Sequence, residues 1–322
     1  MHQKTAEEIK KERMLDNLLN DDMKEFLPYL EDDSVTDIAV VDSGEIIITQ
    51  FGKGRTFTGI FVPDFIVERI IKATASLLGR PLESYTGFPI LEGRIPKYNA
   101  RITGLMQPNC IRPELQIRKP PKEIYSLENY VESGRMTQEQ YDIIVQTIKD
   151  RKNIIVSGST GSGKTTFTNA VIKKMVELTP YDNFYIVEDT PELQCEAKMK
   201  TMLQITQDDA EKAVKESLRF SPDRIIFGEV RTGIVMRELL DAWRTHSGNV
   251  TTLHANDGAS TLLRIKGMMN KYDPELADHL SEVISLVVHL KKTPQGIRVN
   301  EIFNVNEDSD DFLAGIVQHN LG

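Results

Sequence analysis

Hydrophobic and polar positions alternate over short stretches in the first 120 residues of this chain. Apolar runs at 35–41 and 45–49 flank Asp-Ser-Gly at 42–44, and this pattern predicts a β-hairpin. The preceding stretch, 6–31, is charged and carries apolar residues at loosely helical spacing, which predicts a peripheral helix. The first part of the chain therefore mixes helix and strand.

A second helix is predicted between Pro63, which favours the first helical position, and Gly79, which favours a helix end. Residues 87–118 return to short strands broken by glycine and proline, so we expect a smaller α+β domain over residues 1–118. The lysines and prolines that follow disfavour helix and predict a linker over 119–136. The apolar residues expected on one side of the second helix are Phe65, Ile66, Ile70 and Leu77.

Helical spacing dominates the second part of the chain, residues 137–322, which we expect to form one domain. Thr137 and Gln140 have the spacing of a capping box and precede apolar residues spaced as on one helix face. Strands and helices then alternate, which is typical of an α/β fold with a parallel sheet that binds ligands at the carboxyl ends of its strands. The expected elements are strands at 154–157, 184–187, 225–227 and 250–253 and helices at 165–178, 209–219 and 232–245.

A phosphate-binding loop of the pattern G-x-x-x-x-G-K-[ST] joins the first of these strands to the first helix. Its glycines permit positive φ and allow several backbone N–H groups to face one anion. Lys164 is expected to reach the β and γ phosphates of ATP, and the Thr165 hydroxyl to bind Mg²⁺. A glycine turn that merely enters a helix would explain neither residue. The expected nucleotide-binding residues are Gly158, Ser159, Thr160, Gly161, Ser162, Gly163, Lys164, Thr165 and Thr166.

Acidic residues end the next two expected strands. Glu229 is placed to accept the proton of an attacking water or to hold the Mg²⁺ shell, and Glu188 to support that shell. The predicted metal site is therefore Thr165, Glu229 and Glu188. Strand ends often carry acids for structural reasons, and Asp189 is as readily explained as the cap of the Thr-Pro turn that follows it.

Two histidines lie near the end of the expected α/β alternation. His254 directly follows strand 250–253, where it can hydrogen-bond to the γ-phosphate, although a lone histidine is more often structural. His246 lies in a glycine-containing loop with the same two explanations. We include His254 among the candidate catalytic residues and leave the role of His246 open.

Composition limits the classes of function. The chain has 322 residues, a formal net charge of −9 and a pI near 5.3, which argue against a surface built to coat nucleic acid or anionic lipid. Cys110 and Cys195 are far apart and lack metal-site spacing, so free thiols in a reducing cytosol are expected. The N-terminus is too charged for a secretory signal, and no apolar run approaches the roughly 20 residues that span a bilayer.

Four motifs in this order resemble the secretion traffic ATPases that power type IV secretion, type II secretion and type IV pili. They are GSTGSGKTT, IVEDTPELQC, LRFSPDRIIFGEVR and TTLHAN, which resemble the Walker A, acidic, Walker B and histidine boxes of that family. The run EDTPELQC, the segment DAW at 241–243 and the VTDI hairpin strand resemble the conjugative-transfer branch, the TrbB type. The chain lacks the four-cysteine insertion of the type II secretion and pilus-extension branch.

The resemblance implies a cytoplasmic homo-hexamer that docks onto inner-membrane secretion or conjugation subunits. The acidic composition argues against stable direct binding of nucleic acid. Nucleotide would lie between the N-terminal domain and a RecA-like C-terminal domain. Arg101 and Arg118 match the N-terminal arginines that contact the terminal phosphates, and Arg231 matches a further family position. A planar guanidinium suits the charge that builds on a transferring phosphoryl group.

The sequence thus predicts a magnesium-dependent ATPase motor for a type IV secretion or conjugative DNA transfer apparatus. A pilus-retraction ATPase and a nucleic-acid translocase remain alternatives, and strong stimulation of ATP hydrolysis by DNA would favour the translocase. A non-hydrolysing nucleotide-dependent scaffold, which would bind ATP without turnover, is a third hypothesis.

Overall fold

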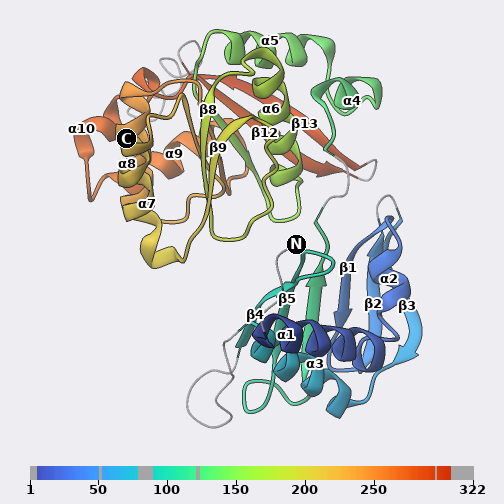
Figure 1. The fold of residues 1–322 in the computed structure, drawn as a ribbon. Helices are drawn as coiled ribbons and strands as arrows, with labels where there is room; N and C mark the ends of the chain where they lie inside the picture. Colours follow the sequence, from blue (N-terminus) through green and yellow to red (C-terminus); the bar gives the residue numbers. More distant parts are fainter. Residues whose placement is uncertain (1–5, 51–52, 79–89, 121–123, 294–295, 306–322) are drawn as a thin grey trace, which may run out of the picture. The chain divides into compact units, whose positions relative to one another are not determined.

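The chain divides after Lys122 into two units, Met1–Lys122 and Glu123–Gly322, each shown in Figure 1. The division falls inside the linker predicted over 119–136. Lys119 belongs to the first unit, because its Nζ donates to the backbone oxygens of Tyr29 and Asp32 at 3.1 and 2.6 Å. The computed structural model describes residues 6–50, 53–78, 90–120, 124–293 and 296–305.

Much of the predicted linker is a structured part of the second unit. The helix α4 (Leu127–Glu132) lies within it and begins with a capping box at Ser126. Leu127, Tyr130 and Met136 are buried in the core of the second unit. These apolar contacts, which local sequence does not reveal, make the predicted linker too long at its C-terminal side.

The first unit contains an antiparallel six-stranded sheet in the order β3-β2-β1-β6-β5-β4. The helix α3 packs on one face of this sheet, and α1 packs in turn against α3 (Figure 1). The α+β prediction and the hairpin of β1 and β2 are confirmed. The strands are β1 (Val35–Val40), β2 (Glu45–Gln50), β3 (Gly54–Phe61), β4 (Ile90–Ile95), β5 (Ala100–Leu105) and β6 (Glu114–Arg118), and α3 is Asp64–Leu77.

Two helix predictions in this unit need correction. Residues 6–31 form three elements in place of one peripheral helix, and Leu18 and Leu19 are buried in the core. In α3 the side chain of Phe65 is 60% exposed, while Val67 and Ile71 join the buried face. The predicted end at Gly79 lies outside the described residues. The three N-terminal elements are α1 (Ala6–Asn17), the π-helical turn η1 (Leu18–Asp22) and α2 (Leu27–Glu31).

The second unit is built on a seven-stranded sheet in the order β13-β12-β7-β11-β10-β8-β9. Every neighbouring pair is parallel except β12 and β13. The expected parallel α/β sheet is therefore confirmed, and it gains three strands that the sequence pattern did not indicate. The strands are β7 (Ile154–Gly158), β8 (Asn183–Glu188), β9 (Met199–Gln204), β10 (Arg224–Phe227), β11 (Val250–Leu253), β12 (Leu286–Thr293) and β13 (Gly296–Asn304).

Helices cover both faces of this sheet and bury alternate residues of each strand. On one face Ile154 and Ile186 pack with α5 and α6, and on the other Ile155 and Val187 pack with α7, α8 and α9. The capping box at the start of α5 is confirmed in both of its hydrogen bonds. The helices are α5 (Gln138–Lys149), α6 (Lys164–Leu178), α7 (Ala210–Ser217), α8 (Gly233–Thr245), α9 (Gly258–Met269) and α10 (Pro274–Asp278), with 3-10 turns η2 (Gln207–Asp209), η3 (Leu218–Phe220) and η4 (Leu280–Glu282).

Candidate active site

The phosphate loop lies at the centre of the second sheet, where β7 runs between β12 and β11 and leads into α6. Gly158, Gly161 and Gly163 have φ values of +154°, +71° and +81°, as predicted for a loop whose amides face one anion. A Cβ on Gly158 would lie 2.4 Å from Ser162 Oγ and 2.6 Å from Leu290 O. The loop can therefore close this tightly only with glycine at its first position.

Lys164 is almost fully buried at the first residue of α6. Its Nζ donates to the backbone oxygens of Gly158 and Ser159, each at 3.1 Å, so the lysine folds back over its own loop. Burial lowers the pKa of Lys164, and the carboxylate of Glu229 opposes that shift. An anion seated in the loop would supply the charge that this buried ammonium group needs.

His254 connects the phosphate loop to the acidic end of the neighbouring strand. Its Nδ1 lies 3.2 Å from Lys164 Nζ, and its Nε2 lies 2.7 Å from Glu229 Oε1. An ammonium group can only donate, so Nδ1 accepts and the ring proton sits on Nε2, where it is donated to Glu229. Burial, and then the charge of Lys164, lower the pKa of His254, which favours this neutral form.

Glu229 continues this chain of polar contacts away from the loop. Its second oxygen, Oε2, lies 3.1 Å from a guanidinium nitrogen of Arg231, and Arg231 pairs in turn with Asp189 Oδ2 at 2.6 Å. The carboxyl ends of β7, β11, β10 and β8 thus carry one connected row: Lys164, His254, Glu229, Arg231 and Asp189. Asp189 Oδ1 also accepts from the N–H of Thr190 at 2.7 Å, as a turn cap would.

Glu188 has a structural role. It is buried, and its Oε1 accepts the backbone N–H groups of Glu192 and Leu193 at 2.9 and 2.8 Å. A Cβ on Gly228 would meet Glu188 Cγ at 3.1 Å, so a larger residue there would press on this side chain. Glu188 therefore shapes the segment that carries Asp189, and its support of a Mg²⁺ shell stays a prediction.

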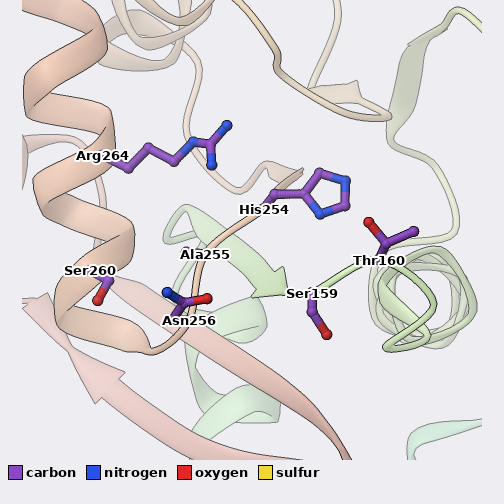
Figure 2. Close-up of a pocket in the computed structure, with 7 residues that line it drawn as sticks. All are labelled: Ser159, Thr160, His254, Ala255, Asn256, Ser260 and Arg264. Carbon is purple, nitrogen blue, oxygen red and sulfur yellow. The ribbon is translucent and has the colours of Figure 1, made fainter.

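A cavity of about 500 Å³ opens beside the phosphate loop. Ser159 and Thr160 line it from the loop and His254 from the end of β11 (Figure 2). The residues that line its other side were not among the predicted site residues, although Asn256 belongs to the TTLHAN motif. They are Asn256, Ser260 and Arg264, the last two spaced four residues apart on α9 and so on one helix face.

His246 lies away from this site. It ends α8 and precedes the amino end of β11, whereas the phosphate loop and His254 lie at the carboxyl ends of their strands. Its Nδ1 lies 2.9 Å from Thr245 Oγ1, and its backbone oxygen accepts from the side chain of Asn249. The structure thus places His246 at the amino end of β11, at the opposite end of the strands from the phosphate loop.

The N-terminal unit carries both predicted arginines in one row across its sheet. Arg94, Arg101 and Arg118 are direct cross-strand neighbours on β4, β5 and β6, and Asp37 on β1 follows Arg118. Arg118 Nε donates to Asp37 Oδ1 at 2.8 Å. Arg94 Nη1 donates to the backbone oxygen of Asn99 at 2.9 Å.

Arg101 lies between the other two arginines, and no ion pair joins it to a carboxylate of the described residues. Its neighbour in the strand, Ile102, points into the core with Ile117, so the arginine row occupies the opposite face of the sheet. Like charges placed directly opposite each other on a sheet are destabilising. The row is therefore suited to bind an anion, and Arg94 is a member that the sequence interpretation missed.

The residues of the loop fit a magnesium nucleotide. Mg²⁺ usually takes only one or two protein ligands and completes its shell with phosphate oxygens and water. Thr165, in the first turn of α6, and Glu229 can supply that number. Within the described ranges, no group of three or more His, Cys, Asp or Glu side chains could hold a metal ion by itself.

Comparison with known proteins gives the family. The family of Type II/IV secretion system proteins matches residues 20–310. The chain belongs to this family. The conjugal transfer protein TrbB of Rhizobium radiobacter is 35% identical over 279 residues, which cover 86% of this chain and 85% of that protein. The predicted resemblance of this traffic ATPase to the conjugative-transfer branch is confirmed.

Two solved structures share the fold. The ATPase DotB of Legionella pneumophila has a TM-score of 0.67 at 19% identity and covers 91% of this chain and 83% of its own. The pilus retraction motor PilT with bound ADP has a TM-score of 0.66 at 18% identity and covers 94% and 88%. The predicted fold, an α/β phosphate-loop domain preceded by a smaller α+β domain, is confirmed for this traffic ATPase. None of its described helices is both long and apolar enough to cross a bilayer.

Proposed function

We propose that this traffic ATPase is a hexameric, magnesium-dependent ATP hydrolase that powers a type IV secretion or conjugative DNA transfer apparatus. The observation that supports the chemistry best is the contact chain from Lys164 through His254 to Glu229. It joins the residue that would hold the phosphates to the residue that would receive the proton of water. A nucleotide-dependent scaffold would not require this connection.

Each of the three residues in this series of contacts has a distinct role in the proposed reaction. Lys164 leaves the backbone oxygens of its loop and neutralises the β and γ phosphates of ATP. Glu229 orients the attacking water and accepts its proton. His254 contacts both Lys164 and Glu229, so it would couple binding of the γ-phosphate to the position of Glu229. Bound Mg²⁺, held by Thr165 and Glu229, would neutralise charge that develops on the phosphate oxygens.

The N-terminal arginines complete the proposed site. Arg101 and Arg118 would contact the terminal phosphates, and the register that places Arg94 beside them supports a role in binding anions. The guanidinium group suits this role because it binds phosphate oxygens through two parallel hydrogen bonds. Loss of the γ-phosphate would release these contacts, which is how hydrolysis would become movement.

The proposed place of work is the cytoplasmic face of the inner membrane, in contact with secretion or conjugation subunits embedded there. The relative named a conjugal transfer protein, similar over most of both chains, supports substrate transfer or pilus assembly. A pilus-retraction role is the alternative, because the fold of PilT is shared.

Phosphate release from ATP by the purified full-length chain tests the proposal. We expect turnover with Mg²⁺, loss of turnover with a chelator, and no dependence on DNA. If ATP binds without turnover even with Mg²⁺ and at concentrations where rings form, that result would contradict the motor and favour the nucleotide-dependent scaffold. Turnover that rises manyfold with DNA would favour the translocase.

A further inference from the structure

We propose that Arg264 binds the terminal phosphate of ATP and so makes the site prefer ATP to ADP. This inference rests on the proposed function, because it assumes that the phosphate loop holds a nucleoside triphosphate. It assigns a role to a residue of α9 that belongs to none of the four sequence motifs.

The cavity beside the loop provides the position. Lys164 is the residue that would contact the β and γ phosphates, and His254 touches its Nζ, so the side of the loop that faces His254 is the γ-phosphate side. The cavity is lined by His254, by Thr160 of the loop and by Arg264. In Figure 2 the Arg264 side chain extends from α9 toward the His254 side of this space. About 500 Å³ is ample for a phosphoryl group and several waters, since one water fills about 30 Å³ of liquid.

The charges around the cavity favour an anion. Arg264 is exposed, and no ion pair joins it to an acidic side chain in the described part of the chain. Lys164 and Arg231 are the other cations near His254, and their charges and that of Arg264 help burial to lower the pKa of that histidine. Glu229 is the acid that faces this group, and it is already engaged by His254 and Arg231.

The position of Arg264 is well supported by α9. Asp257 Oδ1 accepts from the N–H of Ser260 at 2.6 Å, and Glu301 Oε2 on β13 accepts from the N–H of Gly258 at 2.9 Å. Ile265, the next residue after Arg264, is fully buried in the core. The helix is therefore anchored at its first turn and along its buried face, which holds the base of the arginine at the cavity.

A specific guanidinium contact with the γ-phosphate has a measurable signature. ADP lacks this phosphate, so loss of the arginine should weaken ATP binding and leave ADP binding almost unchanged. A residue that only supports the fold of α9 would affect both nucleotides equally. Lysine at this position would keep the charge but lose the two parallel hydrogen bonds, so it should restore affinity in part.

The test measures dissociation constants of the full-length chain for ADP and for a non-hydrolysable ATP analogue, each with Mg²⁺, by calorimetry. Arg264→Ala should weaken binding of the analogue at least about tenfold, which corresponds to about 1.4 kcal/mol. The ADP constant should change by less than about twofold, and Arg264→Lys should lie between wild type and Arg264→Ala. Lys266→Ala is the matched control, because Lys266 lies on the same helix but pairs with Asp278 at 2.7 Å.

The outcomes separate the two proposals. If the Arg264→Ala variant binds both nucleotides as the wild type does, the role of Arg264 is overturned while the proposed function stands. The same conclusion follows if the substitution weakens binding of both nucleotides equally. A wild-type chain that binds neither nucleotide would remove the proposed function, and this inference with it. Selective loss of the ATP analogue, with normal binding by Lys266→Ala, would support the inference.

Discussion

Replacement of Glu229 by glutamine should stop ATP turnover and leave nucleotide binding and the fold intact. The amide oxygen of glutamine can still accept from His254 Nε2, which lies 2.7 Å from Glu229 Oε1. Its NH2 group would then face Arg231, which keeps its 2.6 Å ion pair with Asp189. The variant therefore removes the basic carboxylate with little change in shape.

The substitution should remove several kcal/mol of transition-state stabilisation but change the free energy of unfolding only slightly. The lost ion pair with Arg231 is partly exposed, and pairs of this kind contribute about 0–1 kcal/mol to stability. A positioned general base contributes about 10²–10⁴-fold to rate. Such a loss of rate corresponds to ~3–5 kcal/mol of transition-state stabilisation. Turnover should thus fall at least about a hundredfold, while the free energy of unfolding changes by less than about 1 kcal/mol.

The assay compares phosphate release, ADP affinity and urea unfolding for wild type, Glu229→Gln and Glu216→Gln. Glu216 is a matched control because it is a partly exposed carboxylate that also pairs with an arginine, Arg219, at 2.9 Å. It should behave as wild type in all three measurements. Glu229→Gln that hydrolyses ATP within a few-fold of the wild-type rate would refute the assignment of the base.

Three further predictions follow from the same geometry. Lys164→Ala should weaken binding of ATP at least about tenfold in calorimetry, because hydrogen bonds to charged groups contribute about 1.5–3 kcal/mol; unchanged affinity would contradict its contact with phosphate. Gly158→Ala should lower the midpoint of thermal unfolding, because its Cβ would lie 2.4 Å from Ser162 Oγ and 2.6 Å from Leu290 O and overpacking costs about 1–3 kcal/mol; an unchanged midpoint would show that the loop is not closed as described. Burial lowers the pKa of His254, so its contribution to stability is full above about pH 6.5 and is lost as the pH falls below that value. His254→Gln should therefore show a smaller loss of unfolding free energy between pH 7.5 and 5.5 than wild type, and an equal loss would contradict the assignment.

The sequence predicted the parts of the site that depend on local pattern. The glycines and the lysine of the phosphate loop have required spacings, and the apolar strands before Glu188, Glu229 and His254 put those side chains at one edge of the sheet. Contacts across that edge could not be predicted. Lys164 and His254 are separated by 90 residues, and their hydrogen bond depends on β7 and β11 being neighbours.

Elements with weak patterns were missed for physical reasons. The edge strand β9 exposes Met199 and Met202 and has no continuous apolar run, so its sequence does not look like a buried strand. The helix α4 is short, and it is stabilised by burial of Leu127 and Tyr130 against residues much further along the chain. The sequence does not mark Arg264 as a site residue, because its four-residue spacing from Ser260 occurs on any helix.

The central claim, that this chain is a motor completed by assembly, is tested most directly by its magnesium-dependent ATPase activity per protomer across a wide range of protein concentration. Molecular mass should be measured in the same samples by light scattering. We predict that specific activity rises with concentration to a plateau as the mass reaches that of a hexamer. A specific activity that stays constant across the range while the protein is monomeric would contradict the claim.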